Sequence, residues 1–136
     1  MIVLDTSFLV AYHNERDQQH AKAVQAMREF LDDGRWGVGL LLEYVFLEVV
    51  TVLMIRRDHA VAANVGERLL NAAELDFIPC SDIFIETTKA FAAQRNTQLS
   101  FADMAIAVTA RAKADSQILT FDAEFKKVPG IRVYPA

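Results

Sequence analysis

The stretch Ile2-Val3-Leu4-Asp5-Thr6-Ser7 places an acid directly after a short apolar run. Such a run is typical of a buried strand in a parallel sheet, because helices cover both faces of that sheet. A second stretch, Ile118-Leu119-Thr120-Phe121-Asp122, repeats this arrangement near the other end of the chain. Each stretch predicts a strand that ends in an aspartate. The carboxyl ends of parallel strands lie at one edge of the sheet, so both aspartates are expected at that edge.

Between these two stretches, runs with helical spacing alternate with short strand-like runs. Helices are expected over 16–31, 43–57, 60–73, 81–95 and 101–114. Strands are expected over 2–5, 36–40, 77–80, 117–121 and 131–134. This alternation predicts one α/β domain over residues 1–136, built as a three-layer α/β/α sandwich with a mainly parallel central sheet.

The composition excludes several classes of protein. With 53% hydrophobic and 24% charged residues, the chain is too apolar to be disordered. Its 14 basic and 18 acidic residues argue against a protein that coats nucleic acid, which is usually basic. The single cysteine, Cys80, excludes a disulfide framework and favours a reducing compartment. No leader is evident, and the apolar run 44–55 is about half the length of a membrane span, so a cytoplasmic protein without membrane contact is expected.

Two further acids lie in apolar surroundings. Glu48 interrupts the run 44–55 and shares a helical stripe with Tyr44 and Val52, so it is not expected to point simply to water. Glu43 is the alternative acid on this helix, about 140° around the axis from Glu48. Asp103 stands in the first turn of a helix that Ser100 is expected to cap.

Four acids in such settings point to a cation. An ionised carboxylate loses several kcal/mol of hydration on burial unless a positive charge compensates it. No lysine or arginine lies within five residues of Asp5 or Asp103. Taken singly, Asp103 is explained by a helix N-terminus and Asp122 by a turn. Taken together, Asp5, Glu48, Asp103 and Asp122 favour a site for Mg²⁺ or Mn²⁺, which prefer oxygen ligands.

The sequence resembles the PIN domain family, and within it the toxin-like VapC-type proteins, over essentially its whole length. The motifs that carry the resemblance are Asp5-Thr6-Ser7, Glu48-Val49-Val50-Thr51-Val52-Leu53, Leu99-Ser100-Phe101-Ala102-Asp103, Ile118-Leu119-Thr120-Phe121-Asp122-Ala123-Glu124-Phe125 and Val128-Pro129-Gly130-Ile131-Arg132-Val133. The resemblance implies that Asp5, Glu48, Asp103 and Asp122 match the family's acidic quartet. Ser7 and Thr120 match its supporting hydroxyl positions.

The resemblance further implies a metal-dependent endoribonuclease, a toxin that a cognate antitoxin holds inactive. A homodimer is expected because the helices over 43–57 and 60–73 carry more apolar surface than one small sheet covers. RNA binding then requires cations around the acidic site. The candidates are Arg56, Arg57, Arg95, Arg111, Lys113, Lys126 and Lys127. Tyr12 or Trp36 could stack on bases, whereas His13, His20 and His59 are expected at the surface.

Three alternative functions remain open. A phosphatase that forms an aspartyl-phosphate also has an aspartate after its first strand, but Ser7 stands where its second acid belongs. A receiver domain would need adjacent acids there and a lysine near its last strand. The third alternative is a PIN-like module that binds RNA or protein without catalysis, although all four acids are present.

Overall fold

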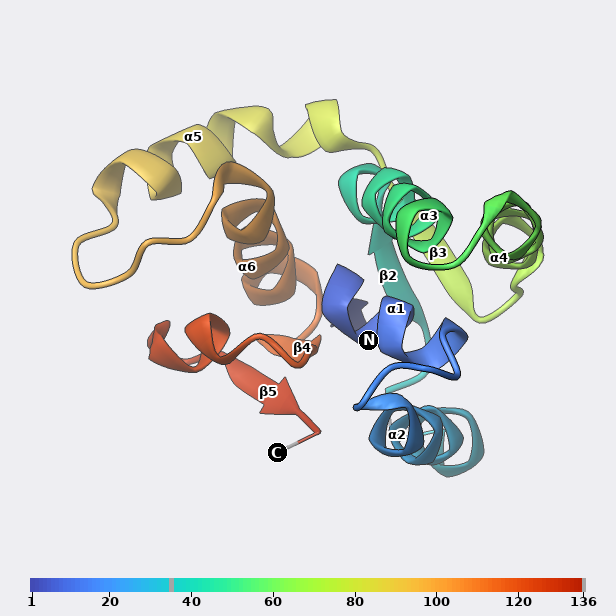
Figure 1. Ribbon diagram of the computed structural model, residues 1–136. Coiled ribbons are helices and arrows are strands. Elements are labelled where there is room, and N and C mark those ends of the chain that lie inside the picture. Colours follow the sequence, from blue (N-terminus) through green and yellow to red (C-terminus); the bar gives the residue numbers. More distant parts are fainter. Residues whose placement is uncertain (35, 136) are drawn as a thin grey trace.

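A five-stranded sheet with the order β3-β2-β1-β4-β5 lies at the centre of the structure (Figure 1). This computed structural model describes residues 1–34 and 36–135. The strands are β1 (Ile2–Leu4), β2 (Gly39–Leu42), β3 (Leu75–Ile78), β4 (Gln117–Leu119) and β5 (Arg132–Tyr134). All four pairings between them are parallel, which confirms the predicted sheet. The three residues of β1 are fully buried at its centre.

Helices form two groups around this sheet. They are α1 (Thr6–His13), α2 (His20–Asp33), α3 (Glu43–Arg56), α4 (His59–Asn71), α5 (Phe84–Ala93) and α6 (Phe101–Lys113), with short 3₁₀ helices η1 (Cys80–Ile83) and η2 (Ala123–Lys127). Helices α1 to α4 pack on one another, and α5 packs on α6, which contacts β1 and β4 (Figure 1). The crossover from β3 to β4 runs back across the sheet. Because such crossovers are right-handed, α5 and α6 cover the opposite face, and the α/β/α prediction is confirmed.

The predicted secondary structure near the N-terminus was wrong in two respects. Helix α1 was not expected, and the helix predicted from residue 16 begins instead at His20. Four consecutive residues of α1, from Phe8 to Ala11, are buried. A short run that is buried on all sides has no helical period and cannot be told from a strand by its pattern.

Strand β2 begins three residues later than predicted, at residue 39 instead of residue 36. Trp36 is not part of it, because its ring packs against Phe30 and Tyr134. The strand begins at Gly39, where an added Cβ would lie only 2.8 Å from Leu75 Cδ2. A glycine therefore permits β2 and β3 to lie side by side here, although glycine weakens a strand prediction.

In the described ranges, 1–34 and 36–135, the helices all lack the length and hydropathy that crossing a lipid bilayer requires.

Candidate active site

Asp5 follows β1 directly and stands at the junction with α1. Its side chain is 5% exposed, and its Oδ2 accepts hydrogen bonds from Thr120 Oγ1 at 2.6 Å and from Ser7 Oγ at 2.9 Å. Burial raises the pKa of Asp5, and these two hydroxyl donors oppose that rise. Ser7 and Thr120 were predicted to support the first aspartate, and both donate to the same oxygen of Asp5.

The two hydroxyls also connect Asp5 to the end of β4. The backbone N–H of Phe121 donates to Ser7 Oγ at 3.0 Å, and that of Asp122 donates to Thr120 Oγ1 at 2.9 Å. Each hydroxyl oxygen therefore accepts from the backbone while its proton serves Asp5. This arrangement fixes the backbone that carries Asp122 relative to Asp5.

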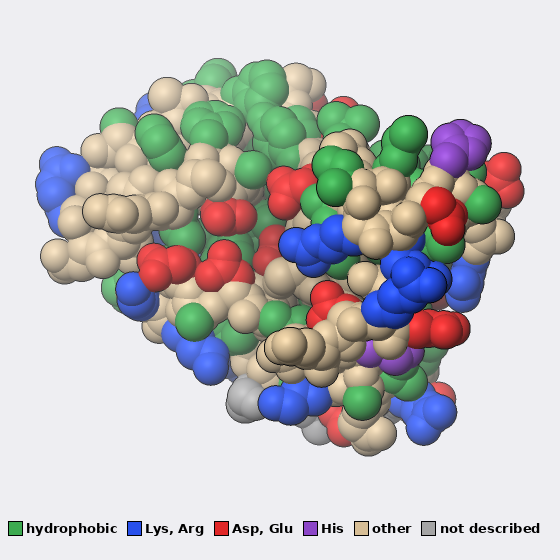
Figure 2. Space-filling model, in the orientation of Figure 1, with side chains coloured by type: hydrophobic (Ala, Val, Ile, Leu, Met, Phe, Trp, Pro, Cys, Tyr) green, Lys and Arg blue, Asp and Glu red, His purple; other side chains and the backbone are tan. Residues whose placement is uncertain are grey.

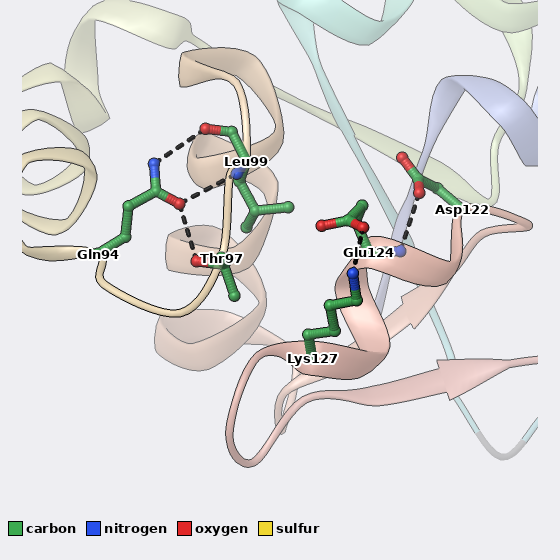
Figure 3. A network of polar contacts seen from close by, with 6 residues as sticks. All are labelled: Gln94, Thr97, Leu99, Asp122, Glu124 and Lys127. Atoms are coloured by element: carbon green, nitrogen blue, oxygen red, sulfur yellow. Dashed lines mark hydrogen bonds and ion pairs between the residues drawn. The ribbon is translucent and has the colours of Figure 1, made fainter.

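Asp122 caps the short helix η2. Its Oδ1 accepts a hydrogen bond from Glu124 N at 2.9 Å, and Glu124 in turn pairs with Lys127 (Figure 3). Asp122 is half-buried and raises the pKa of Asp5 by charge repulsion. It therefore combines the turn role expected of it with a place beside the first aspartate.

Asp103 occupies the first turn of α6, as its spacing predicted. Ser100 Oγ accepts from Asp103 N at 3.1 Å, which is one half of the expected capping box. The pKa of Asp103 is raised to about 6, first by burial and next by the charge of Asp5. Asp122 and Glu48 raise it further, whereas the Ser100 hydrogen bond lowers it. All four predicted acids therefore interact electrostatically around this carboxyl.

The loop before α6 is held by Gln94, a residue that sequence reasoning missed. Its Oε1 accepts from Thr97 Oγ1 at 2.8 Å and from Leu99 N at 3.0 Å, and its Nε2 donates to Leu99 O at 3.0 Å (Figure 3). These contacts fix the entry into α6 and, with it, the place of Asp103. A single glutamine in a polar stretch gives no sequence signal for such a role.

Glu48 lies on α3, and the expectation that it is shielded from water was wrong. The buried stripe of α3 consists of Val45, Val49 and Leu53, and Glu48 is exposed beside it. The helix carries apolar side chains on its solvent face as well, so the apolar run did not mark burial. Glu48 lines the site pocket, while Glu43 does not.

One pocket of about 450 Å³ collects the four acids at the carboxyl edge of the sheet. Its lining, called the site pocket below, comprises Asp5, Thr6, Ser7, Val10, Asp17, Gln19, Glu48, Val52, Arg56, Asp103, Phe121 and Asp122. Asp17 and Gln19, from the loop between α1 and α2, were not predicted there. Acidic side chains gather in the hollow of this face, with basic side chains around it (Figure 2).

A divalent ion fits the chemistry of this pocket. In residues 1–34 and 36–135, the side-chain positions bring no three His, Cys, Asp or Glu groups into a preformed metal cluster. Mg²⁺ does not require one, since it keeps several waters and often binds only one or two carboxylates directly. Burial is the first cause that raises the pKa values of Asp5 and Asp103, and repulsion from neighbouring acids adds to it. A bound dication would offset that repulsion.

The predicted basic rim is only partly formed. Arg56 lines the site pocket, and Lys126 lines a neighbouring pocket together with Lys22, which was not predicted. Other candidates bind elsewhere. Arg57 donates to Asn14, Arg95 to backbone carbonyls of 92 and 94, Arg111 to Pro129 O, and Lys127 pairs with Glu124.

Two expectations for aromatic and histidine side chains were wrong. Trp36 is 5% exposed and therefore unavailable for stacking on a base. His13 and His20 are half-buried rather than at the surface, and His20 Nδ1 lies 2.8 Å from Ala11 O. Burial lowers the pKa of His13 to about 4, so it is neutral at pH 7. His59 is exposed as expected.

Comparison with known proteins gives a family and a fold. The model of the PIN domain family matches residues 2–131. The structure of VapC20 from Mycobacterium tuberculosis, described as a sarcin–ricin loop cleaving toxin, is similar with a TM-score of 0.81 and 20% identity, over 96% of this chain and 97% of that one. FitAcB from Neisseria gonorrhoeae is similar with a TM-score of 0.63 and 17% identity, over 98% and 96%. No curated protein matches the sequence significantly.

The substitution Thr120→Val tests the hydrogen bond that contacts Asp5. It preserves the shape of the side chain but removes one of the two hydroxyl donors that favour the ionised carboxylate. The pKa of Asp5 is expected to rise further in the metal-free protein. Carbon-detected NMR titration of the carboxyl groups measures this. Thr88→Val, which removes an exposed hydroxyl that donates to Phe84 O, is the control. An unchanged pKa of Asp5 in Thr120→Val would contradict the hydrogen bond from Thr120 to Asp5.

The substitution Asp103→Asn tests the charge stored in the pocket. Because the pKa of Asp103 rises from 3.8 to about 6 on folding, folding favours its protonated form. Its contribution to stability is full below pH 3.8 and is lost as the pH rises through about 6. Without metal, the asparagine variant should gain about 1 kcal/mol over the wild type between pH 4 and pH 7.5, a value discounted for solvent screening.

Urea unfolding at both pH values measures this difference. Asp76→Asn, at an exposed position on β3, is the matched control. A gain that is equal at pH 4 and pH 7.5 would show that Asp103 carries no such charge penalty.

Proposed function

Because the chain belongs to the PIN domain family, we propose that it is a divalent-metal-dependent endoribonuclease that hydrolyses RNA phosphodiester bonds. The observation that supports this most is the site pocket, in which Asp5, Glu48, Asp103 and Asp122 lie at the carboxyl edge of the parallel sheet. We assign the whole chain, 1–136, to this one nuclease domain.

Asp5, Glu48 and Asp103 are the proposed principal ligands of Mg²⁺ or Mn²⁺. When bound, such an ion supplies a water of lowered pKa and offsets charge that develops on the phosphate. Asp122 orients water or holds a second ion. Thr120 and Ser7 donate to Asp5 Oδ2 and thereby fix the orientation of its carboxylate.

We further propose that the protein is a toxin with a cognate antitoxin. The similar VapC20 structure is described as a toxin that cleaves the sarcin–ricin loop. At 20% identity this likeness shows the fold, so the RNA target of the present chain is left to experiment. A cytoplasmic location stays a prediction that rests on the single cysteine.

A homodimer is the proposed assembly. Large apolar side chains are exposed on α3 and at the start of α5, where Leu47 is 63%, Ile55 78% and Ile85 74% exposed. Figure 2 shows apolar side chains gathered along the edge of the molecule that α5 forms in Figure 1. Monomeric proteins rarely leave contiguous apolar surface of this kind uncovered.

An aspartyl-phosphate phosphatase is less well supported by the geometry. Ser7 stands where the second acid of such an enzyme belongs, and its hydroxyl is committed to Asp5. A binding module without catalysis would retain the pocket but would not cleave RNA, which the following experiment detects.

The purified protein should cleave RNA with Mn²⁺ or Mg²⁺ and lose activity with EDTA. Asp5→Asn and Glu48→Gln should each reduce the rate of cleavage at least about 100-fold. Removing a residue that only hydrogen-bonds to a metal ligand already lowers metal affinity or activity about 10–100-fold. Labelled RNA resolved on a gel measures cleavage. Glu43→Gln, on the same helix but outside the pocket, should leave the rate unchanged. Cleavage that survives both pocket substitutions would overturn the proposal, and release of phosphate from small phosphoesters alone would favour the phosphatase.

The dimer is tested by Ile85→Glu. A charge placed in a buried apolar interface is costly, so the variant should be monomeric at micromolar concentration where the wild type is dimeric. Light scattering measures the mass. Leu31→Glu, at an exposed position on α2 away from this surface, is the control. A monomeric wild type would contradict the proposed assembly.

A further inference from the structure

A smaller cavity of about 160 Å³ adjoins the site pocket. The two cavities share Gln19, Phe121 and Asp122 in their linings, so they lie side by side along this edge. Lys22 and Lys126 line the smaller cavity and not the site pocket. We call it the lysine pocket; its other lining residues are Thr120, Ala123, Val133 and Pro135.

The two lysines reach this cavity from separate elements. Lys22 is on the first turn of α2 and Lys126 is on η2, and both are exposed. Neither forms an ion pair in the part of the chain that the structure describes. Lys127 differs from its neighbour in this respect, because its Nζ lies 2.6 Å from Glu124 Oε1 (Figure 3). The charges of Lys22 and Lys126 are therefore available to an external anion.

The acid in the lysine pocket offsets only part of this charge. Asp122 is the one carboxylate among the residues that line it, and its Oδ1 accepts from Glu124 N. Two cations therefore face one anion here. In the site pocket the balance is reversed, since Arg56 is the only lysine or arginine beside five lining acids.

We propose that the lysine pocket binds a backbone phosphate of the RNA strand, next to the phosphate that is cleaved in the site pocket. This inference rests on the proposed ribonuclease function and adds the path of the substrate. A polyanion is repelled by the acidic site pocket and needs cations close by. Arg56 supplies one on the α3 side, and Lys22 with Lys126 supplies the other on the η2 side.

The linings favour a phosphate over an acidic protein segment. A strand that enters the site pocket must leave it, and the lysine pocket is adjacent, since the two linings have three residues in common. The cavity is small and its walls carry few large apolar groups, so it suits one phosphate and its sugar better than the side chains of a peptide.

The test compares Lys22→Ala/Lys126→Ala with the wild type on a short single-stranded RNA. Two measurements are made, cleavage kinetics and the salt dependence of equilibrium binding by fluorescence anisotropy in the Asp5→Asn background. The double variant should raise KM about 10-fold and leave kcat nearly unchanged, because the contact is made to a phosphate that does not react and is the same in the ground state and the transition state. The magnitude of its slope of log K against log salt should fall by about 0.7, since single strands lose roughly 0.7 per phosphate contact and the lysine pocket holds one phosphate.

Two further double variants complete the experiment. Arg28→Ala/Lys127→Ala removes the same charge from the same two elements and should change neither KM nor the slope. Lys22→Arg/Lys126→Arg keeps the charge and should retain the wild-type slope. Circular dichroism melts establish that all variants are folded.

The outcomes separate the two proposals. A wild type that does not cleave RNA with either metal overturns the ribonuclease function and the RNA path with it. A wild type that cleaves RNA, with an unchanged slope and KM in Lys22→Ala/Lys126→Ala, overturns the lysine pocket alone. If that variant instead loses only binding to an acidic protein partner, the pocket is a protein site and the RNA path is likewise overturned.

Discussion

The hydrogen bond from Thr120 Oγ1 to Asp5 Oδ2, at 2.6 Å, is the contact on which the site depends. Its two residues lie 115 positions apart and follow the adjacent parallel strands β1 and β4. The register that pairs Leu4 with Leu119 sets the first aspartate beside Thr120. The hydroxyl proton favours the ionised carboxylate, while burial disfavours it. The sheet thus holds a buried carboxylate in a fixed orientation, and a bound cation would favour its ionised form.

Most of the fold could be predicted because its signals are local. Apolar runs that end in Asp5 and Asp122 marked two neighbouring strands, and Ser100 marked the start of α6. The errors about helix α1 and about Glu48 share one physical cause. Helices α1 and α3 are both apolar around most of their circumference. Most of α1 is buried, whereas part of the apolar surface of α3 is exposed to solvent. Periodicity cannot distinguish these cases, so α1 was missed and the burial of Glu48 was misjudged.

The candidate site likewise has one part that could be predicted from the sequence and one part that could not. The acids could be found because carboxylates in apolar runs conflict with the cost of burying charge. The residues that surround these acids lie in polar stretches, where a polar or charged side chain is expected and does not stand out. Gln94, Gln19 and Lys22 are polar residues in polar stretches, and only the tertiary structure shows that they hold a loop or line a pocket. Cations in particular are placed by their partners. Lys126 and Lys127 are adjacent in sequence, yet only Lys127 is engaged by a carboxylate.

The position of β1 between β2 and β4 has a consequence for the order of events during synthesis. Asp5 is made before Thr120 and Asp122, which follow only after more than a hundred further residues. Domains begin to fold from the N-terminal part as the chain emerges. A nascent chain can therefore pair β1 with β2 and β2 with β3, but it lacks the strand that fixes Asp5. The acidic pocket is therefore complete only once β4 has paired with β1 and Asp122 has followed it.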